Sequence, residues 1–216
     1  MIILIPIKKN SKRLKNKNFK LINKIPLYKL TTNFAKKYFS KDQILISTDC
    51  EKTAKKLKSE GLQVPFLRPK SLAKSSSSIF SVAKHAVTNF EIKINKSIDT
   101  IILLQPTSPF RSINELKKAI KLFRKNNLPT MSVSRLQVMS DKIYFYKRRN
   151  IVQAINYYFK RKSYIPNGSF YIISKKDLFK SKNFYKTRMN FVELKKFKNK
   201  IDIDYHDDLE LAKKQF

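Results

Sequence analysis

Residues 100–125 read Thr-Ile-Ile-Leu-Leu-Gln-Pro-Thr-Ser-Pro-Phe-Arg-Ser-Ile-Asn-Glu-Leu-Lys-Lys-Ala-Ile-Lys-Leu-Phe-Arg-Lys and contain a strand, a stiff loop and a helix in succession. The apolar run Thr100–Leu104 predicts a buried strand. Two prolines follow and fix the backbone of the next loop without glycine. Ser112 and Glu115 have the spacing of a capping box, which predicts that a helix begins at Ser112. This stretch therefore predicts one strand–loop–helix unit.

The same alternation extends in both directions along the chain. Short apolar runs predict further strands, and helical patterns lie between them. The predicted strands are Met1–Ile5, Ile44–Ser47, Val64–Leu67, Met131–Ser134, Ile143–Tyr146, Ile151–Ile155 and Ser169–Ile173. The other predicted helices are Pro26–Phe39, Glu51–Glu60, Ser78–Phe90 and Asp204–Gln215. Strands separated by helices predict an α/β fold in which helices cover both faces of a mostly parallel sheet, a three-layer α/β/α architecture. We expect residues 1–216 to form a single domain, from which about 135–165 could project.

The composition is strongly basic, with 48 Lys and Arg against 15 Asp and Glu and a formal net charge of +33. Such an excess is typical of nucleic-acid-binding proteins. However, 39 of the 48 basic residues are Lys, and Gly occurs only twice, so AT-rich codon usage explains much of the charge equally well. No apolar run is long enough to span a bilayer, and the single cysteine, Cys50, excludes an intramolecular disulfide. We therefore expect a cytoplasmic protein.

Sheets of this kind bind ligands outside the carboxyl ends of their strands. The loop Lys8–Asn18 follows the first strand and carries cations, a hydroxyl and amide side chains, which suit a polyphosphate. It lacks the glycines of a Walker P-loop, so a solvated basic loop is the other interpretation. Gln105 ends a predicted strand and offers two donors and an acceptor, which suits recognition of a polar substrate.

Two carboxylates stand close to the end of the chain. Asp202 and Asp204 alternate with isoleucines, so on a strand both would face the same side. Neighbouring carboxylates repel unless a cation lies between them, and hard oxygen ligands suit Mg²⁺. The alternative is that Asp204, or Asp207 in the first turn, caps the terminal helix.

Two further positions stand out at predicted bends. Arg68 follows a predicted strand between prolines, where it could make a structural ion pair or hold a ligand. Gly168, in Pro166-Asn-Gly168, is one of only two glycines. A glycine in so glycine-poor a chain indicates either a positive φ or a close approach to a ligand.

Together these motifs resemble the CMP-sialic acid synthetases, also called acylneuraminate cytidylyltransferases, and the related pseudaminic and legionaminic acid cytidylyltransferases. The matching segments, in order, are Lys8–Asn18, Val64–Pro69, Leu103–Arg111, Pro166–Gly168 and Ile201–Asp204. The resemblance runs over essentially the whole chain. It implies the Rossmann-like fold of the nucleotide-diphospho-sugar transferases, usually dimeric through a small projecting segment. It also implies transfer of CMP from CTP to a nonulosonic acid sugar, release of pyrophosphate, and Mg²⁺ as cofactor.

The resemblance also implies roles for individual residues. The residues that would bind CTP are Lys8, Asn10, Ser11, Lys12, Asn18, Arg68 and Ser78. The sugar would face Gln105, Lys142 and Asn167. Asp202 and Asp204 would bind Mg²⁺ and, with Lys12, would be the catalytic residues. We expect a homodimer, no membrane partner, and no nucleic-acid binding beyond non-specific charge attraction.

The sequence departs from this family mainly on the sugar side. Family members often carry an arginine directly before Pro-Asn-Gly, where this chain has Ile165, and another near the position of Tyr157. Isoleucine cannot replace an arginine that binds a carboxylate through two hydrogen bonds. Either the acceptor differs or the activity is weakened. The alternatives are a related nucleotidyltransferase acting on another sugar acid and a catalytically impaired or nucleic-acid-binding member of the fold.

Overall fold

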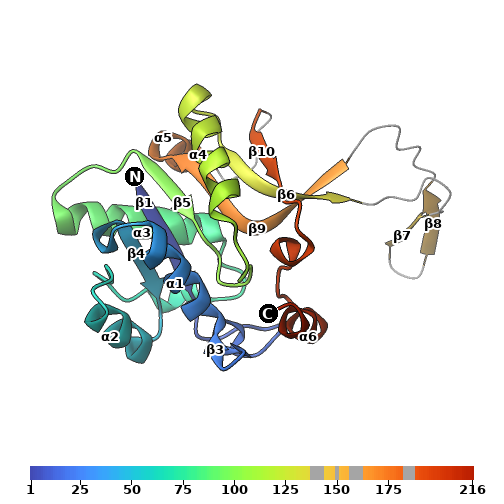
Figure 1. Ribbon diagram of the computed structural model, residues 1–216, viewed down its shortest axis with the longest axis horizontal. Helices are drawn as coiled ribbons and strands as arrows, with labels where there is room; N and C mark the ends of the chain where they lie inside the picture. The colour runs from blue at the N-terminus through green and yellow to red at the C-terminus, as the bar shows by residue number, and fades with distance from the viewer. Residues whose placement is uncertain (137–143, 149–150, 156–162, 182–187) are drawn as a thin grey trace.

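A mixed sheet forms the centre of the molecule (Figure 1). The computed structural model describes residues 1–136, 144–148, 151–155, 163–181 and 188–216. Within these residues, six strands pair in the order β10-β6-β9-β5-β1-β4. Their bounds are β1 (Ile2–Ile7), β4 (Ile44–Thr48), β5 (Thr100–Leu103), β6 (Thr130–Leu136), β9 (Ser163–Ser174) and β10 (Asn190–Glu193). β9 runs antiparallel to both of its neighbours, and the other pairs are parallel. The predicted mostly parallel sheet is confirmed.

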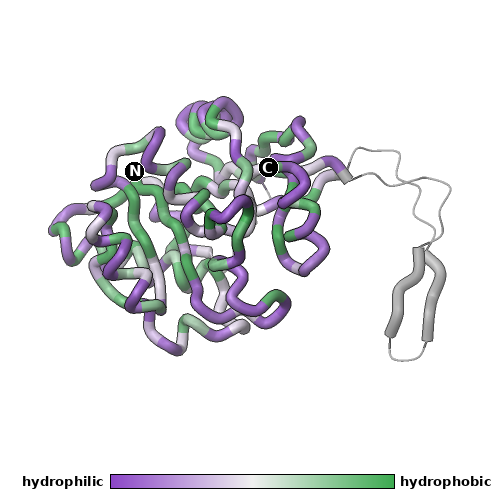
Figure 2. Tube along the Cα trace, turned by 60° about the horizontal axis from the view of Figure 1, so that its bottom comes forward, coloured by the Kyte–Doolittle hydropathy of each residue, from purple (hydrophilic) through white to green (hydrophobic). Residues whose placement is uncertain are grey.

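Helices cover both faces of this sheet. One face packs against α1 (Leu27–Tyr38), α2 (Glu51–Ser59) and α4 (Ile113–Asn126), and the other against α3 (Ile79–Ile94) and α5 (Lys175–Lys180). β1 is buried along its length, and its side chains alternate between the faces: Ile3 and Ile5 join one core, Ile2 and Leu4 the other. Figure 2 shows hydrophobic residues concentrated along the central strands. The three-layer architecture is therefore confirmed.

A third, smaller core lies beside the sheet. α6 (His206–Lys214) packs its apolar residues against the hairpin formed by β2 (Leu21–Ile22) and β3 (Ile25–Pro26). Ile201 and Ile203 belong to the same cluster. The end of the chain is therefore packed beside the loop that follows β1.

The helix predicted to begin at Ser112 is confirmed, with one difference in its cap. The Ser112 hydroxyl accepts the backbone N–H of Glu115 at 3.4 Å, and the first helical residue is Ile113. The Glu115 carboxylate does not turn back to the cap; it accepts the backbone N–H of Lys195 and the side-chain amide of Asn199. This glutamate therefore ties α4 to the segment after β10.

One predicted strand, and a second segment that was considered as a strand, do not form strands in the described residues. Val64–Leu67 forms none, and only the neighbouring Gln63 bridges to Leu45, because Pro65 has no N–H to donate to a ladder. Ile201–Asp204 is also not a strand. α5 and β10, together with the β2–β3 hairpin, were not predicted. Four short 3₁₀ helices occur at Lys17–Phe19, Lys41–Gln43, Lys70–Ala73 and Phe197–Lys200.

β7 (Tyr144–Arg148) and β8 (Ile151–Ile155) form an antiparallel pair, close to the strands predicted there. Most of the segment around 135–165 lies outside the described residues, so its role in dimerisation stays a prediction. None of the helices in the described part of the chain combines the length and the apolar character needed to cross a membrane.

Candidate active site

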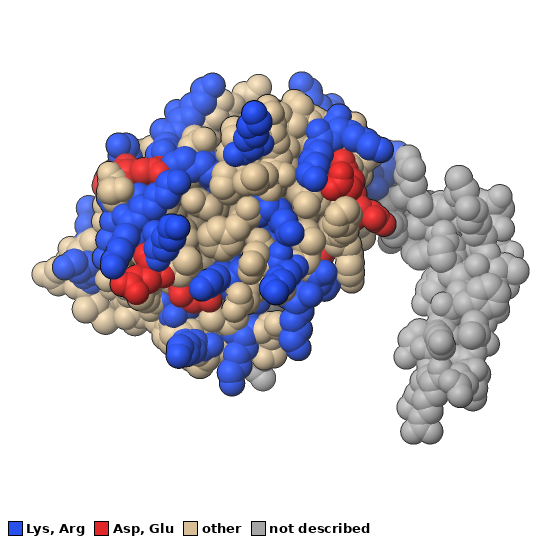
Figure 3. Space-filling view, turned by 90° about the horizontal axis from the view of Figure 1, so that it is seen from below, with Lys and Arg blue, Asp and Glu red and all other residues tan. Residues whose placement is uncertain are grey.

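A cleft of about 240 Å³ lies at the edge of the sheet where β1 and β5 end. Its walls come from the loop after β1, from residues 68–82, and from the loop after β5. The predicted site residues that line it are Lys8, Ser11, Lys12, Asn18, Arg68 and Gln105. Figure 3 views the molecule from the side of this edge, the lower side in Figure 1, where cationic side chains spread widely and acidic ones form smaller patches. The cleft stands where a ligand of an α/β sheet is expected.

The loop after β1 is held in shape by two contacts. Asn18 is buried, and its side-chain amide donates to the carbonyl of Lys8 at 2.9 Å. The backbone N–H of Lys9 donates to Asp49 at 2.8 Å. Partial burial lowers the pKa of Lys8. The nearby charge of Arg68 lowers this pKa further, whereas the charge of Asp49 raises it. Asp49, at the end of β4, is thus a site residue that the sequence reasoning missed.

Arg68 forms part of the cleft wall and also supports β4. Its side chain is 5% exposed, and its Nε donates to the hydroxyl of Ser47 at 3.0 Å. A second guanidinium nitrogen donates to the carbonyl of Ser47. Burial lowers its pKa to about 10, with Asp49 acting in the opposite direction. Its direct hydrogen bonds go to uncharged groups, so its charge remains available to a ligand in the cleft.

Gly168 lies at the meeting point of three polar side chains. Its φ is +74°, and a Cβ at this position would lie 2.8 Å from Gln105 Oε1, 2.9 Å from Ser108 Oγ and 3.1 Å from Asp202 Oδ2. Both predicted reasons for a glycine at position 168 therefore hold: its φ is positive, and other atoms lie too close for a side chain. Those atoms belong to the protein itself and not to a ligand. The neighbouring Asn167 is 5% exposed, and its amide donates to Ser134 Oγ at 3.0 Å.

Asp202 is anchored by the loop that follows β5. Ser108 Oγ lies 3.1 Å from Asp202 Oδ1 and 3.0 Å from the carbonyl of Asn167. Burial raises the pKa of Asp202, although a hydrogen bond from Thr107 opposes the change. The backbone N–H of Ile203 donates to the carbonyl of Thr107 at 2.8 Å. The terminal acidic segment and the Pro-Thr-Ser-Pro loop therefore form one unit.

Asp204 carries two ion pairs. Arg13 Nη1 lies 2.6 Å from Asp204 Oδ2, and Lys17 Nζ lies 2.6 Å from Asp204 Oδ1. The carboxylate that receives the first backbone N–H groups near α6 is Asp208, which accepts those of Asp204 and Tyr205. The alternative in which Asp204 or Asp207 caps the helix is therefore not what the structure shows.

The same two carboxylates determine how well a metal ion would fit. No group of three or more Asp, Glu, His or Cys side chains that could hold a metal occurs in the part of the chain that is described. Mg²⁺ is commonly held by one or two carboxylates, with substrate phosphates and water as its remaining ligands. Asp202 and Asp204 fit such a site if a nucleotide supplies the other oxygens.

Five predicted site residues within the described part of the chain do not line the cleft: Asn10, Ser78, Asn167, Asp202 and Asp204. Asn10 is exposed and is not part of its lining. The hydroxyl of Ser78 accepts the backbone N–H of Ser81 at 3.0 Å and caps α3, whereas Ser75 and Ser77 line the cleft. Lys142 lies outside the described residues, as does Tyr157.

Arg111 is a second residue whose importance the sequence reasoning missed. Its guanidinium donates to the carbonyl of Ser169 at 2.9 Å, to the hydroxyl of Thr31 at 2.9 Å and to the carbonyl of Gln105. Burial lowers its pKa to about 9, and Asp202 acts against the change. Arg111 therefore joins α1, β9 and the loop after β5 behind the site. Its place two residues after Pro109, at the end of the rigid loop, was the available signal.

The comparisons with known proteins agree with this geometry. The cytidylyltransferase family matches residues 2–215 of the chain. CMP-N,N'-diacetyllegionaminic acid synthase of Legionella pneumophila is 28% identical, with 99% of this chain and 95% of that protein covered. N-acylneuraminate cytidylyltransferase of Escherichia coli is 29% identical, with 98% of this chain and 51% of that protein covered, so the chain spans about half of that relative.

A solved structure shows the same fold. CMP:2-keto-3-deoxy-manno-octonic acid synthetase complexed with CTP is similar with a TM-score of 0.66 and 12% identity, covering 99% of this chain and 97% of that one. A sequence identity of 12% supports a similar fold and nothing further. The match over residues 2–215 carries the further step: this chain belongs to the cytidylyltransferase family, and is a nucleotidyltransferase.

Proposed function

We propose that this protein transfers CMP from CTP to a nonulosonic, sialic-acid-like sugar and releases pyrophosphate. The observation that carries the proposal is a cleft lined by cations from the loop after β1 and by residues 105–107 of the loop after β5, the loop that also anchors Asp202 through Ser108. The names of the two relatives, an N-acylneuraminate cytidylyltransferase and a legionaminic acid synthase, support this class of sugar.

The chemistry follows from where the charges lie. The anomeric hydroxyl of the sugar attacks the α-phosphorus of CTP, the new O–P bond forms, the bond to pyrophosphate breaks, and the hydroxyl proton passes to water. Lys8 and Lys12 line the cleft, and in this proposal they neutralise phosphate charge as it shifts to the leaving group. Mg²⁺ held by Asp202 and Asp204 would supply further positive charge at the phosphates. Catalysis is therefore mostly positioning and electrostatics.

The acceptor side is where this protein should differ from its relatives. Gln105 lines the cleft, whereas Ile165 is 47% exposed at the position where family members often have arginine. An apolar side chain there cannot pair with the carboxylate of the sugar. We therefore expect a nonulosonic acid whose carboxylate is recognised by another cation of this lysine-rich surface.

The deciding experiment measures pyrophosphate release with CTP, Mg²⁺ and a panel of acids that includes N-acetylneuraminic, legionaminic, pseudaminic and 2-keto-3-deoxy-manno-octonic acid. The variants Asp202→Asn and Asp204→Asn should lose turnover, and Asp207→Asn, an exposed acid of the same segment, should retain it. If only the octonic acid is turned over, the acceptor is that class of sugar acid and not the nonulosonic acid proposed. No turnover with any acid, together with RNA binding that persists at high salt, would overturn the enzyme proposal.

A binding test separates the nucleotide from the sugar. CTP with Mg²⁺ should raise the midpoint of thermal unfolding more than ATP with Mg²⁺, because only the ligand that the cleft selects stabilises the folded state strongly. Equal shifts for the two nucleotides would contradict selectivity for cytidine.

A further inference from the structure

Both oxygens of the carboxylate of Asp204, which is proposed to bind the metal, already have a cationic partner. Each oxygen of Asp204 has its own cation at 2.6 Å, Arg13 on one side and Lys17 on the other. The two cations differ in burial: the Lys17 side chain is 12% exposed and the Arg13 side chain is 55% exposed. A divalent ion that approached Asp204 would stand next to both cations, and their charges would repel it.

Arg13 has a second contact that holds it beside Asp204. Its guanidinium lies over the ring of Tyr205, 5.5 Å from the ring centroid. Such a contact between a cation and an aromatic ring is attractive and favours this position of the guanidinium. Arg13 is thus kept at the acidic segment by two neighbouring residues, although it belongs to the loop after β1.

The lining of the cleft favours an arriving nucleotide over a free metal ion. Six of the residues that line it are cationic, and none of those residues is acidic. They are Lys8, Lys12, Arg13, Lys17, Arg68 and Lys74. A free divalent cation is repelled by this field, whereas a triphosphate is attracted to it. A triphosphate also offers Arg13 and Lys17 a more highly charged partner than one carboxylate.

We propose that Arg13 and Lys17 are internal counter-ions of Asp204, and that nucleotide phosphates draw them away as the metal binds. The proposal rests on the function proposed above. It makes Arg13 a positioning residue, because it acts through Asp204. Nucleotide and divalent metal then bind cooperatively, and the coupling is reciprocal: CTP strengthens metal binding by the factor by which the metal strengthens CTP binding.

Titration of the whole chain with Mn²⁺, followed by the electron paramagnetic resonance signal of the free ion, tests the proposal without turnover. Wild type should bind Mn²⁺ weakly without nucleotide and more tightly when saturated with CTP in the absence of sugar, after the Mn²⁺ that the same CTP concentration binds without protein is subtracted. Arg13→Ala should bind Mn²⁺ about two- to five-fold more tightly than wild type without nucleotide, the range expected when an exposed ion pair is removed. The same variant should show a smaller gain on adding CTP.

Lys15→Ala is the matched control. Lys15 is exposed in the same loop and carries the same charge, but it makes no ion pair among the residues that the structure describes. Its removal should leave Mn²⁺ affinity within experimental error of wild type. The thermal midpoint of Lys15→Ala should equal that of wild type, whereas that of Arg13→Ala should be slightly lower, because this variant loses the ion pair with Asp204 and the contact with Tyr205.

The outcomes separate the two proposals. Equal effects of Arg13→Ala and Lys15→Ala would show a general charge effect and overturn the counter-ion exchange. Equal Mn²⁺ affinity of wild type with and without CTP would also overturn it. If CTP does not stabilise wild type at all, the proposed function fails first, since that test does not depend on Arg13. Arg13→Lys should restore most of the wild-type behaviour if the charge at Asp204 is what matters.

Discussion

Gly168 has no room for a side chain, because the oxygens of Gln105, Ser108 and Asp202 surround its α-carbon. Gly168→Ala is expected to destabilise the protein by about 1–3 kcal/mol through its positive φ alone. It should also reduce turnover strongly, because Gln105 or Asp202 must move to admit the methyl group. Urea unfolding and pyrophosphate release measure the two effects.

Gly61→Ala is the control for that variant. Its φ is +83°, but the nearest atom to a Cβ there is Cδ of the flexible Lys41 side chain, at 3.2 Å. This variant should share the backbone cost and keep its turnover. Equal losses of activity in the two variants would show that the polar contacts at Gly168 do not matter.

The buried charge of Asp202 is expected to lower the stability of the folded protein. Because burial raises its pKa, the folded protein binds this proton more tightly than the unfolded chain does. The stability from that proton is complete below the ordinary carboxyl pKa of 3.8 and is lost as the pH rises through the raised value. Asp202→Asn should therefore raise the thermal midpoint at pH 7 by about 2–4 °C, the shift that about 1 kcal/mol produces in a chain of this size.

The pH dependence checks the cause. The advantage of Asp202→Asn over wild type should shrink as the pH is lowered from 7 toward about 4, where both side chains are neutral. Asp207→Asn, at an exposed position, should show no such trend. An advantage that does not vary with pH would mean that the carboxylate charge is not what costs stability.

At the scale of elements, Arg111 joins α1, β9 and the loop after β5. Lysine carries the charge but lacks the planar fork of donors that reaches three separate acceptors. Arg111→Lys is expected to cost about 2–3 kcal/mol in the free energy of unfolding, because buried carbonyls lose their partners. Arg124→Lys, at an exposed position of α4, should cost almost nothing in the same urea titration. Similar midpoints for the two variants would contradict the joining role.

Local sequence patterns predicted the elements whose burial is regular. β1, β4 and β5 were predicted because all of their residues except Ser47 are apolar or β-branched and short loops or helices flank them. α5 has only six residues, and β10 carries Asn190 and Glu193 in a four-residue strand. Neither segment is long enough to show the spacing of apolar residues that identifies a helix or a strand. The placement of β9 between β5 and β6 depends on long-range pairing, which no local pattern encodes.

The site was predictable to the extent that residue type alone indicates chemistry. On that basis we predicted Lys8 and Lys12 of the first loop, Gln105, and the pair Asp202 and Asp204. Asp49, Arg13 and Arg111 were not, because their roles arise from partners between 40 and 191 positions away or from neutral acceptors on other elements. Ser78 was predicted to bind CTP, but in a run of four serines only the fold decides which one caps a helix.

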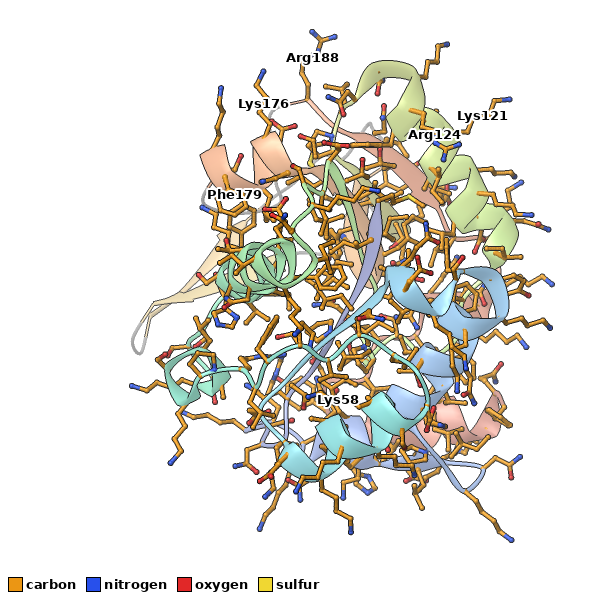
Figure 4. The ribbon with its side chains drawn as sticks, turned by 90° about the vertical axis from the view of Figure 1, so that its left-hand side faces the viewer. Lys58, Lys121, Arg124, Lys176, Phe179 and Arg188 are labelled. Atoms are coloured by element: carbon orange, nitrogen blue, oxygen red, sulfur yellow. The ribbon has the colours of Figure 1, made fainter. Side chains whose placement is uncertain are left out.

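For the whole molecule, the charge of +33 predicts non-specific attraction to polyanions rather than a dedicated nucleic-acid site. Figure 4 shows Lys121, Lys176 and Arg188 extending outward, on a side of the molecule away from the cleft. Retention on RNA should therefore be strong at low salt and lost by about 0.5 M NaCl, as expected when phosphate contacts dominate. Stabilisation by CTP should persist at that salt concentration. RNA binding that resists 0.5 M NaCl would point to a specific site.

The position of β9 also governs how the chain can fold. β5 and β6 are made early, yet they never pair with each other, because β9 is inserted between them. During synthesis the inner edges of both strands therefore stay open until residue 174 has emerged, and open edges invite pairing with other chains. Asp202 joins the site later still. Folding should thus be a late, slow event that depends on the last third of the chain, and fragments that end before β9 should aggregate.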